Sequence, residues 1–383
     1  MEFGLLSKRS MRVLVSSVAV ATGLTFGILP NAAFADTAPT PPEPETVSND
    51  ALPTVQVDGV VWSQVVVGNT VYVGGNFTTA RPAGAAPGTN TVARTYLLAY
   101  DITTGELINS FAPTLNGQVL GLAASPDGTR IYAVGDVNGS NKYRAVALNA
   151  SNGSTITSFS PGFNARARSV VATNDTVYIG GSFTSVSGVT RTRLAALRAS
   201  NGAVLDWAPT AAGGGNQVTA LALTPDNSKL VVGGSYTALN GVTTYGLGAV
   251  DPATGATVPW TAGNVIKNAG TKAGITSLTL SNGTIYGTGY VFGSEAGIPK
   301  GNLEGAFAAD PNSGDIKWVS GCHGDTYSAF STGGVLYSVG HAHDCRDIGG
   351  FPQTEPWTWY RGTAMTEAST QVNRTNVVGG YFN

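Results

Sequence analysis

A short strand that ends in two glycines recurs along this chain and constrains its fold more than any other feature. The motif reads Val71-Tyr-Val-Gly-Gly-Asn-Phe77, Val177-Tyr-Ile-Gly-Gly-Ser-Phe183 and Leu230-Val-Val-Gly-Gly-Ser-Tyr236. Degenerate copies begin at Ile131, Ile285 and Leu336. An apolar stretch and a turn rich in Gly, Asn or Asp precede each copy. Because such turns tolerate positive φ or pre-set a tight reversal, each copy is predicted to belong to a β-hairpin.

A second signature, a five-residue turn that closes with glycine, follows five of these hairpins. The turns are Asp101-Ile-Thr-Thr-Gly105, Asn149-Ala-Ser-Asn-Gly153, Arg198-Ala-Ser-Asn-Gly202, Asp251-Pro-Ala-Thr-Gly255 and Asp310-Pro-Asn-Ser-Gly314. An Asp or Asn side chain caps such a turn, and the closing glycine takes the left-handed conformation. An aromatic residue appears a few positions later in each unit: Phe111, Phe159, Trp207, Trp260 and Trp318. Each unit therefore reads as four strands with an aromatic on the outermost one.

Four antiparallel strands that repeat every 45 to 60 residues predict an all-β chain folded as a β-propeller. The paired glycines suit inner strands that crowd around a central channel. The blade units lie near residues 55–113, 118–161, 168–209, 217–260, 273–318 and 322–372. A chain of β-sandwich domains is the alternative, but it requires two similar blocks of about seven strands each. The expectation is about six four-stranded blades.

The end of the chain leaves the blade number open. The sixth unit lacks the five-residue turn and carries a long segment with Pro and Trp instead. After it, Val377-Val-Gly-Gly-Tyr-Phe382 starts the paired-glycine motif again. This segment is either a closing strand or the start of a further blade in a longer natural chain. The second interpretation is favoured, because every other copy of the motif continues into two more strands, and it predicts seven blades.

Residues 1–35 have the pattern of a secretory signal peptide. Lys8, Arg9 and Arg12 precede an apolar run, and Ala33-Phe34-Ala35 forms a cleavage site. A membrane anchor would need a longer apolar run. Residues 36–50 are rich in Pro and Glu and predict a solvated linker, followed by the repeat domain over residues 51–383. The protein is therefore expected to be secreted or extracellular, with association to a cell surface left open.

The charge balance excludes one class of partner. The whole chain has 21 basic and 23 acidic residues. Without residues 1–35, which contain Lys8, Arg9, Arg12 and Glu2, 18 basic and 22 acidic residues remain, a net charge of −4. No basic surplus is then available to neutralise phosphates, so nucleic acid is not an expected partner. After signal cleavage the chain is not expected to be an integral membrane protein.

The repeats resemble those of the secreted repeat propellers of actinobacteria, over nearly all of the mature chain. The resemblance rests on the Val-Tyr-Val-Gly-Gly-x-Phe-Thr hairpins, the Leu-Ala-Ala-Leu strands and the Trp-x-Pro endings. It also rests on Cys322-His-Gly-Asp-Thr-Tyr327, His341-Ala-His-Asp-Cys345 and Gly349-Gly-Phe-Pro-Gln-Thr354. PKD-like or lectin-like modules often follow such propellers. The resemblance implies an architecture but no particular reaction, since propellers host binding and catalysis alike.

The sixth unit contains both cysteines of the chain, and a disulfide between them is predicted. If Gly333-Gly334 forms a two-residue turn, Thr332 faces Val335. Continued pairing then puts Cys322 opposite Cys345. Direct opposition on an antiparallel pair brings the β-carbons close enough for a bridge.

All three histidines, His323, His341 and His343, lie in the same unit and raise the question of a metal site with Asp325 and Asp344. The predicted register weighs against it, because His341 and His343 point to one side of the sheet and His323 to the other. A cross-strand pair of His323 with Asp344 is the alternative. The sequence therefore predicts no metal site and no cofactor, and neither calcium nor zinc is supported. Asp310-Pro-Asn-Ser-Gly-Asp315 resembles part of a calcium loop but coincides with a repeated turn.

Trp357, Trp359 and Tyr360 are the candidate ligand-binding residues. On a strand, Trp357 and Trp359 share a face and form an aromatic platform of the kind that stacks on sugar rings. The alternative is that their rings fill the core, as Phe or Trp does in the other units. Nearby carboxylates that suit a glycosidase pair are Asp325, Asp344, Asp347 and Glu355.

Two functions remain open at this point. The first is an extracellular binding propeller that recognises a polysaccharide or a cell-surface glycoprotein. The second is a secreted carbohydrate-active enzyme, a glycoside hydrolase or polysaccharide lyase, with Asp325, His341, His343 and Asp344 as candidate catalytic residues. The sequence contains no His-Glu-x-x-His, Gly-x-Ser-x-Gly, Walker or paired Cys-x-x-Cys motif. Binding is therefore the favoured hypothesis.

Overall fold

The computed structural model describes residues 44, 53–137, 143–346 and 350–368. Its secondary structure is almost entirely antiparallel β-sheet, with one short helix, α1 (Ala262–Val265), in the described residues. The predicted signal peptide, nearly all of the linker and the motif at 377–382 lie outside these ranges. No helix in the described ranges is long and apolar enough to cross a membrane.

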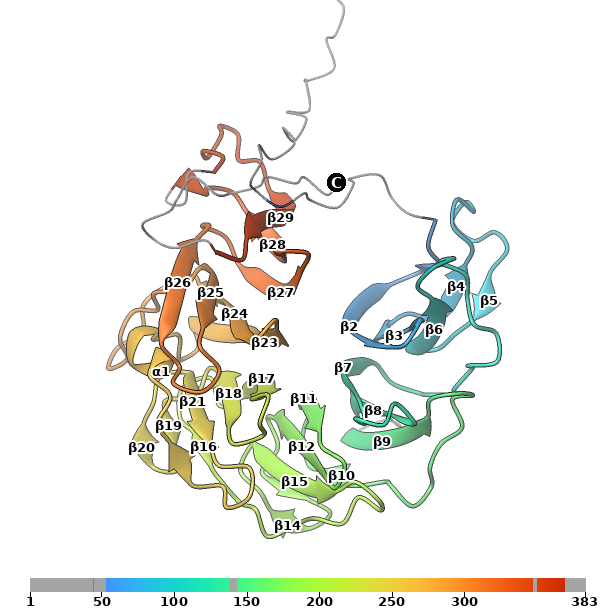
Figure 1. Ribbon diagram of the computed structural model, residues 1–383, viewed down its shortest axis with the longest axis horizontal. Helices are drawn as coiled ribbons and strands as arrows, with labels where there is room; N and C mark the ends of the chain where they lie inside the picture. The colour runs from blue at the N-terminus through green and yellow to red at the C-terminus, as the bar shows by residue number, and fades with distance from the viewer. Residues whose placement is uncertain (1–43, 45–52, 138–142, 347–349, 369–383) are drawn as a thin grey trace, which may run out of the picture. The chain divides into compact units, whose positions relative to one another are not determined.

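Six sheets in the described part of the chain carry the repeats (Figure 1). The first contains β2 (Val60–Val67), β3 (Thr70–Asn76) and β6 (Leu97–Asp101), and the second contains β7 (Val119–Ala124), β8 (Arg130–Gly135) and β9 (Tyr143–Asn149). The third contains β11 (Ala167–Ala172), β12 (Thr176–Gly181) and β15 (Leu194–Arg198). The fourth contains β17 (Val218–Leu223), β18 (Leu230–Gly234), β21 (Leu247–Val250) and β22 (Thr257–Val258). The fifth contains β23 (Ala273–Ser281), β24 (Thr284–Val291), β25 (Gly305–Ala309) and β26 (Ile316–Gly321), and the sixth contains β27 (Thr326–Thr332), β28 (Val335–Ala342) and β29 (Tyr360–Thr366).

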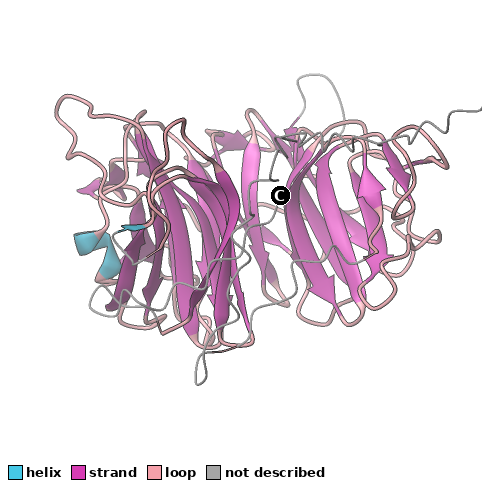
Figure 2. Cartoon of the chain, turned by 90° about the horizontal axis from the view of Figure 1, so that it is seen from above, coloured by secondary structure: helices cyan, strands magenta, loops and turns pink. Residues whose placement is uncertain are grey.

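The first strand of each sheet is its inner edge, and these strands contact one another in chain order. Contacts join β2 to β7, β7 to β11, β11 to β17, β17 to β23 and β23 to β27. Figure 1 shows this succession of inner strands, and Figure 2 shows the strands running between two faces made of loops. Sheets that stack face to face around their inner strands are the blades of a β-propeller. The predicted fold class is confirmed, while the number of blades stays a prediction.

The fourth strand of the blade is less regular than predicted. It has six residues in the fifth sheet, as β26, and two in the fourth sheet, as β22. In the first three sheets it is reduced to single bridges: Tyr100–Leu107, Leu148–Thr155 and Leu197–Val204. Phe111, Phe159 and Trp207 follow these three bridges and are buried, so in the first three blades packing of the aromatic, more than backbone pairing, holds the outer edge.

Three small outer sheets were not predicted from the sequence, and each combines one strand that precedes a blade's hairpin with two strands that follow its Gly-Gly-x-Phe or Gly-Gly-x-Tyr. They are β1 (Gln56–Val57), β4 (Thr79–Arg81) and β5 (Val92–Ala93); β10 (Gly162–Phe163), β13 (Ser185–Val186) and β14 (Val189–Thr190); and β16 (Ala211–Ala212), β19 (Ala238–Leu239) and β20 (Val242–Thr243). The second of these three continues the sheet of β7, β8 and β9. Asn240-Gly241 has positive φ at both residues, the geometry of a type I′ hairpin turn, so this dipeptide was the available signal.

The second glycine of the motif makes room for a bulge in the inner strand. In the first sheet, Val61 pairs with Gly75 and Ser63 pairs with Gly74, which leaves Trp62 as the extra, bulged residue. A Cβ on Gly75 would overlap the carbonyl oxygen of Val60. Equivalent bulges occur on all six inner strands, opposite Gly75, Gly135, Gly181, Gly234, Gly289 and Gly340. Any side chain at this position would push the bulged strand away.

The first glycine makes room for the next blade instead. A Cβ on Gly74 would lie 2.5 Å from Cγ1 of Val119, on the inner strand of the second sheet. Gly180 faces Val218 in the same way, and Gly233 faces Ile275. The second sheet carries Val134 at this position, and the facing residue is the smaller Ala167 in the same core cluster. Neighbouring sheets therefore pack one small against one large residue.

The five-residue turns and the aromatics link consecutive blades a second time. The indole N–H groups of Trp207 and Trp260 donate to the backbone oxygens of Asp251 and Pro311, which belong to the turns of the next blades. The closing glycines of the second to fifth turns pack on the end of the preceding blade, as Gly255 does on Pro209. The Trp-x-Pro endings and the Asp-x-x-x-Gly turns are thus two halves of one contact.

The first and sixth sheets lie at the two ends of this succession. Each exposes a residue at a position that, in the other sheets, packs against a neighbouring sheet. Val61 holds the position of Val119 and is 36% exposed, and Val339 holds the position of Gly74 and is 51% exposed. Val119 itself is fully buried. Both exposed residues are large, so they do not form the size-matched pair seen at the contacts between the first five sheets.

Exchanging the sizes of one such pair tests this packing rule. Gly74→Val alone is expected to lower the free energy of unfolding by about 1–3 kcal/mol, because it overpacks the contact with Val119. Adding Val119→Ala recreates the Val134–Ala167 arrangement and is expected to recover most of the loss. Urea denaturation of both single variants and the double variant gives the coupling energy. Strictly additive losses would contradict the rule.

Candidate functional site

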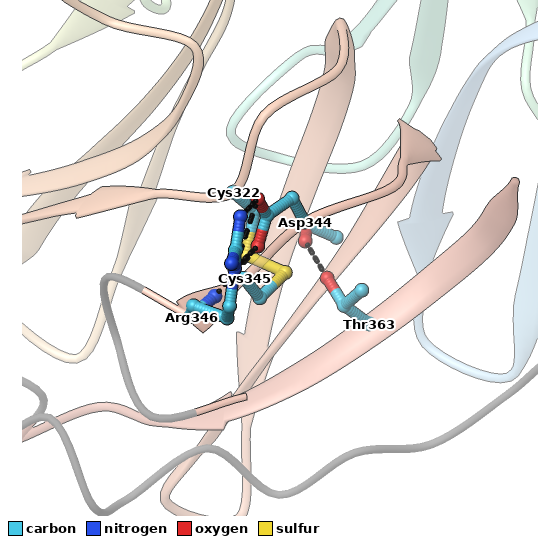
Figure 3. The surroundings of a disulfide bond; sticks show 6 residues. Cys322, Asp344, Cys345, Arg346 and Thr363 are labelled. Atoms are coloured by element: carbon cyan, nitrogen blue, oxygen red, sulfur yellow. Dashed lines mark hydrogen bonds and ion pairs between the residues drawn. A yellow bond between two sulfur atoms is a disulfide. The ribbon is translucent and has the colours of Figure 1, made fainter. Parts of the chain in front are cut away.

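The sixth blade contains the predicted disulfide (Figure 3). Thr332 pairs with Val335 across the Gly333-Gly334 turn, as predicted. The bulge at Tyr327 shifts the pairing of β27 with β28 by one residue from the predicted register. An irregularity in β28 shifts it back, so that His323 pairs with Asp344 in the predicted register. Cys322 and Cys345 therefore face each other with their Cα atoms 4.2 Å apart, and the disulfide prediction is confirmed.

Asp344 pairs with His323 through a backbone hydrogen bond, which refines the expected cross-strand pair. The His323 N–H donates to the Asp344 backbone oxygen at 2.9 Å. The Asp344 carboxylate instead accepts hydrogen bonds from Nε and Nη2 of Arg346, at 2.9 and 2.6 Å (Figure 3). These bonds lower the pKa of Asp344 to about 2. The Asp344 carboxylate is therefore ionised and bonded to Arg346, so it holds no proton that a general acid could donate.

Five aromatic rings form a continuous row over the sixth blade, and we call them the aromatic strip: Tyr327, His341, His343, Trp357 and Trp359. The ring centroids of Tyr327 and His341 are 5.8 Å apart, and those of His341 and Trp359 are 5.0 Å apart. The strip continues from Trp359 to Trp357 at 5.6 Å. His343 stacks on Trp357 at 4.4 Å with 21° between the ring planes. The structure thus brings four of the predicted site residues together and adds Tyr327.

Trp357 and Trp359 were predicted to lie on a strand. They lie instead in the loop directly before β29. The Thr354 hydroxyl braces this loop, because it accepts the Thr358 N–H at 3.0 Å and donates to the Pro356 backbone oxygen at 2.8 Å. The two Trp side chains are 46% and 45% exposed, so the alternative that they fill the core is wrong. Tyr360 begins β29, and its ring packs against Phe351 at 3.9 Å, toward the core.

Hydrogen bonds set the orientation and tautomer of His341. The Asp325 backbone N–H donates to Nε2 of His341 at 3.1 Å, so this nitrogen is an acceptor. Nδ1 then carries the proton and donates to the Tyr327 oxygen at 3.0 Å. The hydroxyl proton of Tyr327 is consequently directed away from His341. Tyr327 is 50% exposed and presents a hydrogen-bond donor at the inner end of the strip.

The remaining candidates have separate surroundings. Burial raises the pKa of Asp325, and the nearby Glu304 carboxylate raises it further. The Asp325 carboxylate accepts no hydrogen bond from the described residues. Glu355 accepts a hydrogen bond from the Trp357 indole at 3.3 Å, and Asp347 lies outside the described residues. Among the predicted carboxylates that the structure describes, no two are therefore free and paired, but Glu304, which was not predicted, lies within electrostatic reach of Asp325.

No group of three or more His, Cys, Asp or Glu in the described ranges is arranged to hold a metal ion. Both ring nitrogens of His341 already have partners, the Asp325 N–H and the Tyr327 hydroxyl. His323 contacts the Glu304 carboxylate at 3.4 Å. The Asp310 carboxylate accepts the N–H groups of Asn312 and Ser313, the bonds of a capped turn.

No family model matches this chain, and no curated protein matches it. Similar solved structures include the computationally designed Ika8 protein, at 12% identity over 86% of this chain and 92% of that chain, with a TM-score of 0.47. The β-propeller domain of Cps50 (Swd1) from Myceliophteria thermophila has 10% identity over 83% and 97% of the two chains, with a TM-score of 0.45. Hydrazine synthase from Kuenenia stuttgartiensis has 10% identity over 88% and 100%, with a TM-score of 0.49. Identities this low carry no information about activity, and the propeller assignment rests on the sheets described above.

Removing the disulfide is expected to destabilise the sixth blade. The two cysteines are 23 residues apart, and opening a loop of this size costs about 3 kcal/mol of unfolding free energy. The double variant Cys322→Ala/Cys345→Ala, compared with the wild type by urea denaturation, measures this loss. Gly74→Val places a separate defect in the first blade. If its loss of unfolding free energy adds to that of the double cysteine variant, the effect of the disulfide is local to the sixth blade.

The Asp344–Arg346 pair predicts a specific pH dependence. The pKa of Asp344 is lowered from 3.8 to about 2 in the folded state, so its stabilising contribution is complete above pH 3.8 and is lost as the pH falls toward 2. Arg346→Gln is expected to raise this pKa and to flatten the slope of stability against pH in that window. Acid titration followed by circular dichroism measures the slope, and an unchanged slope would show that the pair contributes nothing.

Proposed function

We propose that this protein is an extracellular binding propeller, of the secreted actinobacterial kind that its repeats resemble, and that it recognises a glycan chain across the aromatic strip. The observation that carries the proposal is the exposure of Trp357 and Trp359. The other tryptophans at the blade ends, Trp207, Trp260 and Trp318, are 5% exposed or less and serve the contact between blades. Two exposed indoles held in fixed contact with histidine rings have no such structural task.

The strip has the chemistry of a sugar-stacking surface. Pyranose rings have an apolar face of C–H groups, and burying it against an indole removes apolar surface from water without requiring charge. Ring centroids in contact along the strip are 4.4 to 5.8 Å apart, and most neighbouring ring planes are steeply inclined to one another, so the strip offers both faces and edges of rings to a sugar. Hydroxyl groups of the sugar would meet donors at the edges, including the Tyr327 hydroxyl. Binding is therefore expected to depend weakly on salt.

The environment of the site supports binding more than catalysis. The Asp344 carboxylate is occupied by Arg346, and the His341 nitrogens are occupied by the Asp325 N–H and Tyr327. A glycosidase requires two carboxyl groups on either side of the bond that is broken. The proposed partner is a polysaccharide or a cell-surface glycoprotein that carries this glycan.

Retention on insoluble polysaccharides tests the proposal. The purified protein is incubated with cellulose, xylan, chitin and peptidoglycan, and the bound fraction and the released oligosaccharides are measured together. Trp357→Ala and Trp359→Ala are each expected to weaken retention about tenfold, the equivalent of about 1.4 kcal/mol of lost stacking. Phe330→Ala is the matched control, because Phe330 is an exposed aromatic of the same sheet outside the strip.

Retention that the two Trp variants lose and the control keeps supports the proposal. Retention on none of the polymers, or equal retention by all variants, contradicts it. Newly released oligosaccharides would favour the enzyme hypothesis instead. Asp325→Asn and His341→Ala would then be the variants that separate turnover from binding.

A further inference from the structure

The inner-strand bulge of the sixth blade exposes a hydroxyl group at a position that the two preceding blades use to hold the propeller together. The bulged residues of the fourth, fifth and sixth blades are Thr219, Thr276 and Tyr327. The Thr219 hydroxyl donates to the backbone oxygen of Ile275, and the Thr276 hydroxyl donates to that of Thr326 at 2.6 Å. Both bonds join one blade to the next. The side chain of Tyr327 is 50% exposed instead, and its hydroxyl bonds to a histidine ring of its own sheet.

Two backbone groups of Asp325 hold that histidine, His341, in one orientation. The Asp325 N–H donates to Nε2 of the His341 ring at 3.1 Å, and the His341 N–H donates to the Asp325 oxygen at 3.0 Å. The Asp325 oxygen in turn lies against Gly340, where a Cβ would overlap it. The bulge that exposes Tyr327 therefore also positions the backbone that orients His341.

This arrangement determines where the hydroxyl proton of Tyr327 points. A backbone N–H can only donate, so Nε2 of His341 is an acceptor and the proton of the neutral ring is on Nδ1. Nδ1 lies 3.0 Å from the Tyr327 oxygen and donates to it. The side of the oxygen that faces the ring is then filled, and the hydroxyl proton is directed away from it. No group in the described part of the chain accepts this proton, so Tyr327 is a donor of fixed orientation.

An exposed indole lies beside this donor, because one imidazole contacts both. The ring planes of Tyr327 and His341 are inclined by 68° with centroids 5.8 Å apart, and those of His341 and Trp359 by 78° at 5.0 Å. Both are edge-to-face contacts, which fix the relative positions of the three rings. Trp359 is 45% exposed. A ligand that fits this pair of groups has an apolar face for the indole and, on a short arm, an acceptor for the hydroxyl.

The charges around Tyr327 favour a neutral ligand. Burial raises the pKa of Tyr327 and the Asp325 carboxylate raises it further, while the Arg361 guanidinium lowers it. The raised pKa keeps the hydroxyl protonated at neutral pH, as a donor requires. One negative and one positive group lie within electrostatic reach, so their effects on a charged ligand oppose each other.

We infer that Tyr327 makes the aromatic strip selective for N-acetylated amino sugars: the sugar ring stacks on Trp359, and its acetamido carbonyl accepts the Tyr327 hydroxyl. The inference rests on the proposed function and names the class of sugar within it. An amide carbonyl is a stronger acceptor than a sugar hydroxyl, and the acetyl methyl group buries further apolar surface. A plain hydroxyl in its place would carry a proton of its own toward an oxygen that already accepts from His341.

Two matched oligosaccharides test the inference. Chitotetraose and cellotetraose have the same backbone and linkage, are both uncharged, and differ in carrying an acetamido or a hydroxyl group at one carbon of each ring. Calorimetric titration of the purified protein is expected to show about tenfold tighter binding of chitotetraose. Tyr327→Phe keeps the ring and should bring the ratio of the two affinities to about one. Tyr337→Phe is the matched control, the same change on β28 outside the strip, and should keep the ratio.

His341 is a positioning residue in this inference, and its variant has a distinct signature. His341→Leu removes the N–H that fixes the Tyr327 oxygen, so the hydroxyl is free to rotate. The variant should lower the ratio of the two affinities, whereas a purely structural role of the ring would weaken both oligosaccharides equally.

The outcomes separate this inference from the proposed function. Equal binding of the two oligosaccharides by the wild type overturns the selectivity and leaves stacking on the aromatic strip standing. A preference for chitotetraose that survives Tyr327→Phe also overturns it. Binding of neither contradicts the proposed function, and the inference fails with it. Retention on chitin, on peptidoglycan or on a glycoprotein that carries N-acetylglucosamine, when Tyr327→Phe loses it, supports the inference and identifies the source of the sugar.

Discussion

A carbonyl oxygen of each inner strand lies where the neighbouring strand would otherwise carry a Cβ, and much of the structure depends on this close approach. In the first blade the oxygen belongs to Val60 and the missing Cβ to Gly75. The approach is possible only with glycine, and it accommodates one extra residue in the inner strand. The bulge then decides which side chains leave the sheet face for the centre of the propeller. The second glycine of the motif therefore determines which residue of each inner strand is the bulged one.

The contacts between blades follow from the same pair of strands. The first glycine of the motif receives a Val or Ile of the next blade, and the outer aromatics donate to the turn of the next blade. Each blade thus covers its neighbour at an inner and an outer point. These repeated contacts use the tryptophans at the blade ends as structural groups, which is why the exposed pair at Trp357 and Trp359 stands out chemically.

The sixth blade departs from the repeat in features that suit a binding site more than a structural role. A long connection replaces the five-residue turn, a disulfide joins its strands, and its bulge residue is an exposed tyrosine. The aromatic strip starts at this bulge and runs outward over the blade. The glycan binding that we propose for the strip uses the burial of apolar surface.

The sequence alone determined what local rules determine: the hairpin repeat, the propeller class, the capped turns, the buried aromatics and the Cys322–Cys345 bridge, which follows from counting residues outward from one turn. Tertiary structure decided what depends on neighbouring blades. It showed why the two glycines are needed, placed Trp357 and Trp359 in a loop instead of a strand, and paired Asp344 with Arg346. It also brought Tyr290 within electrostatic reach of both Arg168 and Asp325, although the three residues come from three blades. The residue pattern within one repeat cannot predict such an interaction between blades, because the interaction forms only when separate sheets pack around a common axis.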